Sequence, residues 1–175
     1  MTQPASIRRA RTDDAGAVSA LIQEYVPVGT LLPRAPEFIA ERTIDFLVAT
    51  VRSQVIGCVH LEEYSPSMAE LRSLVVDPAY QGQGVGIALV AAVEELAARR
   101  DYPTIFAVSN NEAFFRARGY MPRSIPELDR ERSAVSRFKG VFAKDLVRPA
   151  SVTSAPGATA TATATSRAKR ERSSG

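Results

Sequence analysis

The chain has 175 residues, of which 45% are hydrophobic and 23% charged, a composition typical of one globular domain with a sizeable core. It contains one cysteine, which excludes an internal disulfide, and no apolar run long enough to cross a membrane. The net charge of +3 comes from the end of the chain, because from Arg148 onward five basic residues face one acidic residue. Residues 1–147 therefore carry about −1, which disfavours a nucleic-acid-binding body.

The composition divides the chain into two parts. Residues 1–147 are predicted to form a single domain. Residues 148–175 ("RPASVTSAPGATATATATSRAKRERSSG") hold no large apolar residue after Val152, so they cannot offset the entropy of ordering and are predicted to form a disordered basic tail. The first ten residues lack the apolar stretch of a secretory signal, and with a single thiol this predicts a cytoplasmic protein.

Strands and helices are predicted to alternate from the start of the domain. A short strand at residues 6–10 precedes a helix that Thr12 could cap. Apolar side chains recur at helical spacing along this helix, at Ala15, Val18, Leu21, Ile22 and Tyr25. Pro27 and Gly29 end the helix, and a second short helix is predicted to begin near Pro36.

The middle and end of the domain are predicted to be richer in strands. Two strands, at residues 45–51 and 54–64, surround a polar turn and predict a hairpin. A longer strand follows ("MAELRSLVVDP"), then a glycine-rich turn and a helix at residues 85–99. The last predicted elements are a strand ("PTIFAVS"), a short helix ending at Gly119 and a final strand ("SRFKGVFAKDL"). This order predicts a mixed α/β sheet.

The turn "QGQGVG", residues 81–86, connects the long strand to its helix. Glycine permits a positive φ and lets a ligand approach the main chain closely. The start of a helix offers unpaired N–H groups and the positive end of the helix dipole, which together favour a phosphate. The glycine spacing matches neither the dinucleotide-binding fingerprint nor a P-loop. A phosphate site is predicted here, and a glycine-rich turn without a ligand is the alternative.

In its context of strand, Asp-Pro, turn and helix, "QGQGVG" resembles the Q/R-x-x-G-x-G/A turn of the GCN5-related N-acetyltransferases (GNAT). The resemblance covers residues 7–146. It implies the GNAT fold, a mixed and mostly antiparallel central sheet with helices on both faces and splayed strands at the cofactor site. It also implies acetyl-CoA as co-substrate, bound through its pyrophosphate and pantetheine arm, and no metal. The residues implied at the cofactor are Leu74, Val75, Val76, Gln81, Gly82, Gln83, Gly84, Val85, Gly86, Asn111 and Phe114.

Four segments resemble more specifically the acetyltransferase domain of N-acetylglutamate synthases: "GTLLPR", "AELRSLVVDP", "FFRARGY" and "PELDRERSAVSRFKGVFAKDL". This similarity implies L-glutamate as the acceptor, in the first step of arginine biosynthesis. Guanidinium groups bind carboxylates bidentately. The resemblance places Arg34, Arg72 and Arg137 at the substrate, with Lys139 as a weaker candidate.

The strand that carries Arg72 also carries the predicted general base. Period two would place Glu70, Arg72 and Leu74 on one face, so Arg72 either binds substrate or pairs with Glu70. An α-amine is mostly protonated at pH 7 and must lose a proton before it attacks a thioester. Glu70 is predicted to take that proton, and a surface charge is the alternative. An amide near Leu74 or Val75 is expected to stabilise the oxyanion.

The proton donor to the departing thiolate is less clearly marked. Many relatives use a tyrosine in the helix that follows the fifth strand, where this chain has Phe114 and another phenylalanine. Ser109 is a nearby polar residue and is, with Glu70, the other catalytic candidate, here as the possible proton donor. His60 and Cys58 alternate along a strand and are expected to be packed. The sequence has no cluster of cysteine and histidine residues, so no metal is predicted.

Three functions therefore stay open. The first is a glutamate N-acetyltransferase. The second is a GNAT enzyme that acts on another small amine or a protein N-terminus. The third is a non-catalytic acetyl-CoA binder, or a protein associated with nucleic acid through its tail. The sequence favours a small-molecule substrate, disfavours membrane and nucleic acid as partners, and leaves a homodimer open.

Overall fold

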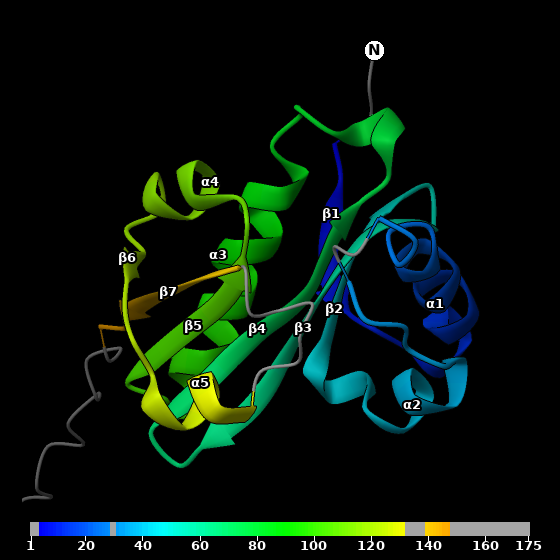
Figure 1. Ribbon diagram of the computed structural model, residues 1–175. Coiled ribbons are helices and arrows are strands. Elements are labelled where there is room, and N and C mark those ends of the chain that lie inside the picture. Colours follow the sequence, from blue (N-terminus) through cyan, green and yellow to red (C-terminus); the bar gives the residue numbers. More distant parts are fainter. Residues whose placement is uncertain (1–3, 29–30, 132–138, 148–175) are drawn as a thin grey trace, which may run out of the picture.

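The computed structural model describes residues 4–28, 31–131 and 139–147. Its centre is one sheet in the order β1-β2-β3-β4-β5-β7-β6, as Figure 1 shows. All neighbouring strands are antiparallel except β4 and β5, which are parallel. The strands are β1 (Ser6–Arg9), β2 (Phe46–Val51), β3 (Gln54–Ser65), β4 (Met68–Val76), β5 (Thr104–Ser109), β6 (Met121–Pro122) and β7 (Gly140–Asp145).

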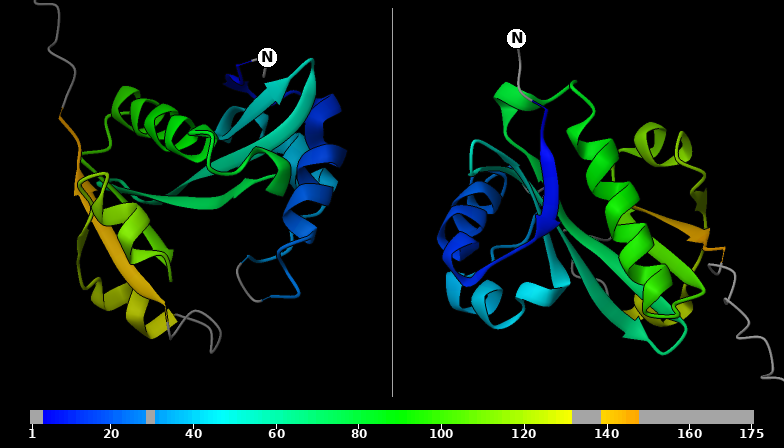
Figure 2. Two further views of the ribbon diagram at one scale, coloured as in Figure 1. Left: turned by 90° about the horizontal axis from the view of Figure 1, so that it is seen from above. Right: turned by 180° about the vertical axis from the view of Figure 1, so that it is seen from behind.

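Helices cover both faces of this sheet, so the predicted mixed and mostly antiparallel α/β fold is confirmed. Figure 2 shows α3 on one face and α1 on the other. The α-helices are α1 (Ala15–Gln23), α2 (Pro36–Glu41), α3 (Val85–Arg99), α4 (Glu112–Arg116) and α5 (Pro126–Glu131). Short 3-10 turns precede α1, β2 and α3, namely η1 (Thr12–Asp14), η2 (Thr43–Asp45) and η3 (Pro78–Tyr80).

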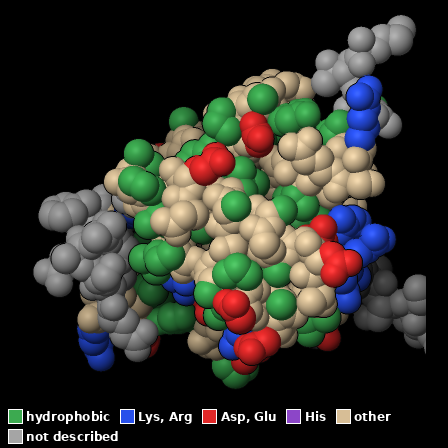
Figure 3. Space-filling view, turned by 90° about the vertical axis from the view of Figure 1, so that its right-hand side faces the viewer, with side chains coloured by type: hydrophobic (Ala, Val, Ile, Leu, Met, Phe, Trp, Pro, Cys, Tyr) green, Lys and Arg blue, Asp and Glu red, His purple; other side chains and the backbone are tan. Residues whose placement is uncertain are grey.

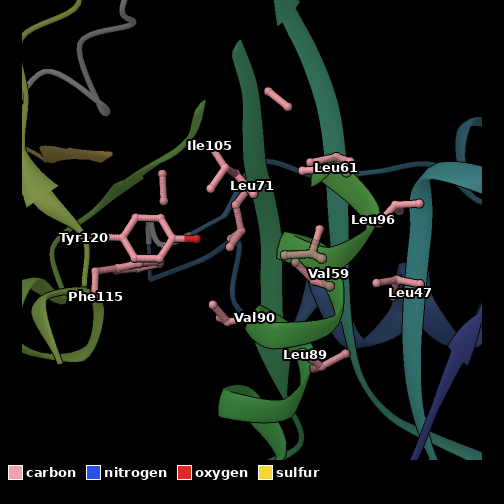
Figure 4. Close-up of a cluster of buried hydrophobic side chains, with 14 of the residues drawn as sticks. Leu47, Val59, Leu61, Leu71, Leu89, Val90, Leu96, Ile105, Phe115 and Tyr120 are labelled. Atoms are coloured by element: carbon pink, nitrogen blue, oxygen red, sulfur yellow. The ribbon is translucent and has the colours of Figure 1, made fainter. Parts of the chain in front are cut away.

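The main core lies between α3 and the sheet. Leu89, Val90 and Leu96 of α3 belong to a cluster with buried apolar side chains from five strands, and each fully buried side chain of this kind contributes about 1.5–3 kcal/mol. Figure 4 shows these contacts, and Phe115 and Tyr120 extend the cluster beside α4. The sheet residues labelled there are Leu47, Val59, Leu61, Leu71 and Ile105.

Local sequence explains most of the connections. The predicted hairpin joins β2 and β3 through Arg52 (φ 48°) and Ser53 (φ 68°), and two positive φ values in a two-residue loop match the twist of the strands. The expected cap at Thr12 is wrong. Thr12 lies inside η1, where the Asp14 carboxylate accepts the Arg11 N–H at 2.6 Å.

The end of the domain is more divided than expected. The sequence prediction missed the two-residue β6 and the short α5, which lie between α4 and β7. The proposed tail, and part of the segment predicted as the last strand, lie outside the described residues.

Within the described part, no helix is long and apolar enough to cross a membrane. On the face drawn in Figure 3, basic side chains are interspersed with acidic ones.

Two backbone features prepare a site beside β4. The parallel pairing of β4 with β5 joins residues 68–71 to residues 104–107, and beyond these the strands diverge. Ser73 of β4 has a φ of 51°, and the β3–β4 register shifts beside it, which is a β-bulge. The divergence opens a gap between neighbouring strands, and the bulge changes which side chains face each side.

Candidate active site

A cleft of about 1270 Å³ lies where β4 and β5 diverge. It runs from the glycine turn before α3 to a group of charged side chains on β3 and β4, and the segment after α1 also lines it. Most of the predicted site residues meet here. They are Arg34, Glu70, Arg72, Leu74, Val75, Val76, Gln81, Gly82, Gly84, Gly86, Ser109, Asn111, Phe114 and Lys139.

The glycine turn has the geometry that a phosphate requires. Gly82 and Gly84 have φ values of 73° and 83°, and a Cβ on either would point into open space. Gly84 is the residue immediately before α3, so the unpaired N–H groups of a 15-residue helix begin at this turn. The positive φ values explain why side-chain-bearing residues are disfavoured here, and the helix start makes the turn suitable for an anion.

The Gln81 side chain connects the turn to the segment after α1 and to β4. Its Nε2 donates to the Val76 carbonyl at 2.9 Å and to the Tyr25 hydroxyl at 2.8 Å. The Tyr25 hydroxyl donates in turn to the same Val76 carbonyl at 2.9 Å. Tyr25 therefore connects the segment after α1 to the strand end and the turn, a contact between residues 51 positions apart.

Charged residues gather at the other end of the cleft. Glu62 on β3 lies directly opposite Glu70 on β4, and His60 lies opposite Arg72. Arg72 donates to Glu62, and its Nε lies 3.7 Å from a Glu70 oxygen. Two carboxylates thus share one guanidinium, and the stronger contact of Arg72 is with Glu62.

The two carboxylates differ in their protonation chemistry. Only 13% of the Glu70 side chain is exposed, and burial raises its pKa above the ordinary value despite the attraction of Arg72. Burial acts in the same direction on Glu62, but the hydrogen bond and charge of Arg72 outweigh it and hold the pKa of Glu62 below its ordinary value. Glu70 is the more basic carboxylate and the better proton acceptor.

His60 is a packing residue, as the sequence predicts. It is 1% exposed and stacks on Phe46 with a ring separation of 4.2 Å. Burial lowers its pKa to about 4, so it is neutral near pH 7. Cys58 is fully buried, and burial raises the pKa of its thiol to about 12. The described residues contain no group of three side chains that could hold a metal ion.

Arg34 brings a further cation to the charged end. Its guanidinium lies 5.1 Å from the centre of the Phe38 ring, and its buried Nε has no hydrogen-bond partner. Burial, followed by repulsion from Arg72, lowers the pKa of Arg34, although a guanidinium stays charged at neutral pH. A buried donor without a partner is costly, so this group is suited to an incoming anion.

Ser109 and Asn111 follow β5 at the cleft wall. The Ser109 hydroxyl accepts the Asn111 N–H at 3.0 Å, and the Asn111 side chain accepts the Phe114 N–H at 3.2 Å. These bonds fix the start of α4. They leave the Ser109 O–H available as a donor.

Some predicted residues are placed differently. The bulge at Ser73 turns Leu74 toward the α3 side of the sheet, so the expectation that it shares a face with Glu70 and Arg72 is wrong. The Gln83 side chain turns back to the Ala79 carbonyl at 3.0 Å, and the Val85 side chain packs in the core, so neither lines the cleft. Arg137 lies outside the described residues.

The predicted site residues leave out several that line the cleft, among them Tyr25, Glu62 and Arg118. The sequence pattern predicts Tyr25 only as part of an apolar helical face. Glu62 acquires its role through pairing with β4, and Arg118 through the folding of α4 beside the turn. Only the motif "FFRARGY" hinted at the segment that contains Arg118.

Comparison with known proteins agrees with this geometry. Residues 42–122 match the model of the acetyltransferase (GNAT) domain. An uncharacterized N-acetyltransferase of Chlorobaculum tepidum is 36% identical over 114 residues, which cover 65% of this chain and 74% of the relative. An amino-acid acetyltransferase of Pseudomonas aeruginosa is 30% identical over 145 residues. That alignment covers 80% of this chain but 34% of the longer relative.

Solved structures give the same result. N-acetylglutamate synthase of Neisseria gonorrhoeae, complexed with coenzyme A and N-acetyl-glutamate, superposes with a TM-score of 0.76 at 26% identity. The match covers 85% of this chain and 36% of the synthase. A Mycobacterium tuberculosis protein in complex with CoA has a TM-score of 0.71 at 25% identity, covering 81% of this chain and 99% of that protein. Together with the splayed strands and the glycine turn, these matches show that the chain belongs to the GNAT acetyltransferase family.

Proposed function

We propose that this chain transfers the acetyl group of acetyl-CoA to the α-amine of L-glutamate. Use of acetyl-CoA in N-acetyl transfer follows from membership of the GNAT family, and the acceptor is the new element. The observation that carries it is the charged end of the cleft, where Arg34 presents a guanidinium with a buried and unpartnered Nε beside Arg72. Cations there suit an acceptor that carries carboxylates.

We expect the cofactor to occupy the other end of the cleft. The amides of the turn and of the first turn of α3 would hold the pyrophosphate, and Asn111 and Phe114 would line the arm. The pantetheine arm would run between β4 and β5. These strands are not paired with each other beyond residues 71 and 107, so their backbone groups there can face the arm. The thioester would then reach the charged end, close to the amides at Leu74 and Val75.

The reaction needs one base and one acid. Glu70 would accept a proton from the ammonium group, directly or through water, and the free amine would attack the thioester carbon. An amide near Leu74 or Val75 would stabilise the oxyanion. As the C–S bond breaks, the attacking nitrogen loses its second proton and the thiolate gains one, and Ser109 at the cleft wall is the candidate to relay this proton. Arg72 is engaged by Glu62, so Arg34 would bind a substrate carboxylate, with Lys139 and Arg137 as further candidates.

The direct test is release of free thiol from acetyl-CoA with L-glutamate, compared with other amino acids and a blank without amine. Saturation by glutamate alone supports the proposal. Turnover with a different amine but not with glutamate would show that glutamate is not the acceptor. The substrate of this chain would then differ from the one suggested by its similarity to the amino-acid acetyltransferase and the N-acetylglutamate synthase.

Arg34→Met is expected to raise the KM for glutamate about 10- to 100-fold, because a charge-assisted hydrogen bond to a buried cation contributes roughly 1.5–3 kcal/mol. The KM for acetyl-CoA should not change. Arg42→Met is the matched control, since Arg42 also lies over the Phe38 ring, at 4.2 Å, but does not line this cleft. Equal effects of the two variants on the glutamate KM would contradict a substrate role for Arg34.

Tyr25→Phe tests whether the Tyr25 hydroxyl positions the glycine turn. The variant removes the hydroxyl that bonds Gln81 and the Val76 carbonyl but keeps the ring. We expect the KM for acetyl-CoA to rise about 3- to 10-fold, because a net hydrogen bond contributes about 0.5–1.5 kcal/mol. Steady-state kinetics with acetyl-CoA varied at saturating acceptor measures this, and an unchanged KM would show that the network does not position the turn.

A further inference from the structure

Arg118 lies in the cleft beside the glycine turn, four residues beyond Phe114. Its guanidinium carbon is 3.7 Å from the centre of the Phe114 ring. The same ring borders the first turn of α3, since a Cβ built on Gly86 would lie 3.7 Å from two of its atoms. Phe114 therefore connects the Arg118 guanidinium to the anion-binding end of α3.

The bonding of Arg118 is incomplete. Its Nη1 donates to the Phe114 carbonyl, while its Nε is buried and has no hydrogen-bond partner. In the described part of the chain, no carboxylate forms a salt bridge with Arg118. The neighbouring Arg116 differs, because it pairs with Glu112. Arg118 is a cation held over an aromatic ring, with donors and charge left for an external anion.

The cofactor carries more negative charge than the turn accounts for. This step rests on the proposed function, in which the amides of the turn hold the pyrophosphate. CoA also has a 3′-phosphate, a monoester with a charge of about −1.5 to −2 at neutral pH. The other described arginines that line the cleft, Arg34 and Arg72, lie at the acceptor end beside Glu62 and Glu70. Arg118 is the arginine at the cofactor end.

We propose that Arg118 binds the 3′-phosphate of CoA and makes this protein selective for CoA over 3′-dephospho-CoA. The planar guanidinium can donate two parallel hydrogen bonds to phosphate oxygens. Stacking on Phe114 restricts the side chain before the cofactor arrives, so less conformational entropy is lost on binding. Binding would also satisfy the charge of Arg118, which has no acidic partner among the described residues.

Calorimetric titration of the full chain with CoA and with 3′-dephospho-CoA tests this. Wild type should bind CoA about 10- to 100-fold more tightly, the range expected for charge-assisted hydrogen bonds. Arg118→Met should bind CoA as weakly as wild type binds 3′-dephospho-CoA, with the dissociation constant for 3′-dephospho-CoA little changed. Arg116→Met removes the same charge from the same segment and should keep the wild-type preference.

The outcomes separate this inference from the proposed function. If wild type binds both ligands equally, Arg118 does not select the 3′-phosphate, although the chain still binds CoA. If wild type binds neither ligand, both proposals fail. If Arg118→Met weakens both ligands to the same extent, Arg118 acts on a shared part such as the pyrophosphate, and the assignment is overturned. The comparison of the two ligands on wild type decides the selectivity even if Arg118→Met does not fold.

Discussion

Replacing Glu70 by glutamine is expected to lower kcat about 100- to 10,000-fold, the usual contribution of a positioned general base. Glutamine keeps the size and the hydrogen-bonding shape of the side chain but cannot accept the proton of the ammonium group. Binding of acetyl-CoA, measured by titration, should not change, because Glu70 lies at the charged end of the cleft. A kcat within a few-fold of wild type would exclude Glu70 as the base.

The pH profile gives a second readout of the same variant. Burial raises the pKa of Glu70, so in wild type the acid limb of kcat/KM should lie above the ordinary value of 4.5. Activity rises with pH along this limb because the ionised carboxylate is the active form. In Glu70→Gln this limb should disappear, and the remaining activity should increase about tenfold per pH unit toward the pKa of the acceptor, since only the free amine reacts.

Glu62→Gln is the matched comparison. Glu62 lies opposite Glu70 in the same cleft, but Arg72 holds its pKa below the ordinary value, so it is a poor base. We expect a smaller loss of kcat and a lower free energy of unfolding, because Arg72 loses its main partner. A larger kcat loss in Glu62→Gln than in Glu70→Gln would transfer the role of base to Glu62.

Glu70→Gln is expected to lower kcat but not the free energy of unfolding at pH 7. A carboxyl group whose pKa is higher in the folded than in the unfolded chain opposes folding once pH rises through the folded value. Glu70→Gln removes this penalty, so it should be at least as stable as wild type at pH 7, and the advantage should fade as the pH falls toward 4.5. Denaturant unfolding at several pH values would measure it.

Gly84→Ala should weaken acetyl-CoA binding more than tenfold and lower the free energy of unfolding by about 1–2 kcal/mol. Gly84 has a φ of 83°, and the strain on alanine comes from the backbone, since a Cβ there meets nothing within 4 Å. Relief of that strain would turn the amides of the turn away from the pyrophosphate. Titration with acetyl-CoA and denaturant unfolding measure the two effects separately.

Gly16→Ala is the control for this substitution. Gly16 lies in α1, where a Cβ also meets nothing within 4 Å and φ is not positive. Alanine should stabilise the helix by about 0.5–1 kcal/mol and leave acetyl-CoA binding unchanged. If Gly84→Ala loses stability but binds acetyl-CoA normally, the turn does not hold the pyrophosphate.

The sequence by itself determined the features that depend on neighbouring residues. The order of strands and helices from β1 to α4, the hairpin at Arg52 and Ser53, and the glycine turn before α3 all follow from local φ preferences and from hydrophobic periodicity. The packed states of Cys58 and His60 follow from alternation along one strand. These predictions need no knowledge of which strands lie side by side.

Only the tertiary structure decided how the charged end of the cleft is assembled. Glu62 and Arg72 are paired by the register of β3 and β4, and the bulge at Ser73 then moves Leu74 to the other face. Arg118 enters the cleft because α4 packs beside α3. Register, bulges and helix packing depend on contacts between distant segments, and one shifted residue exchanges the two faces of a strand, so local periodicity could not predict them.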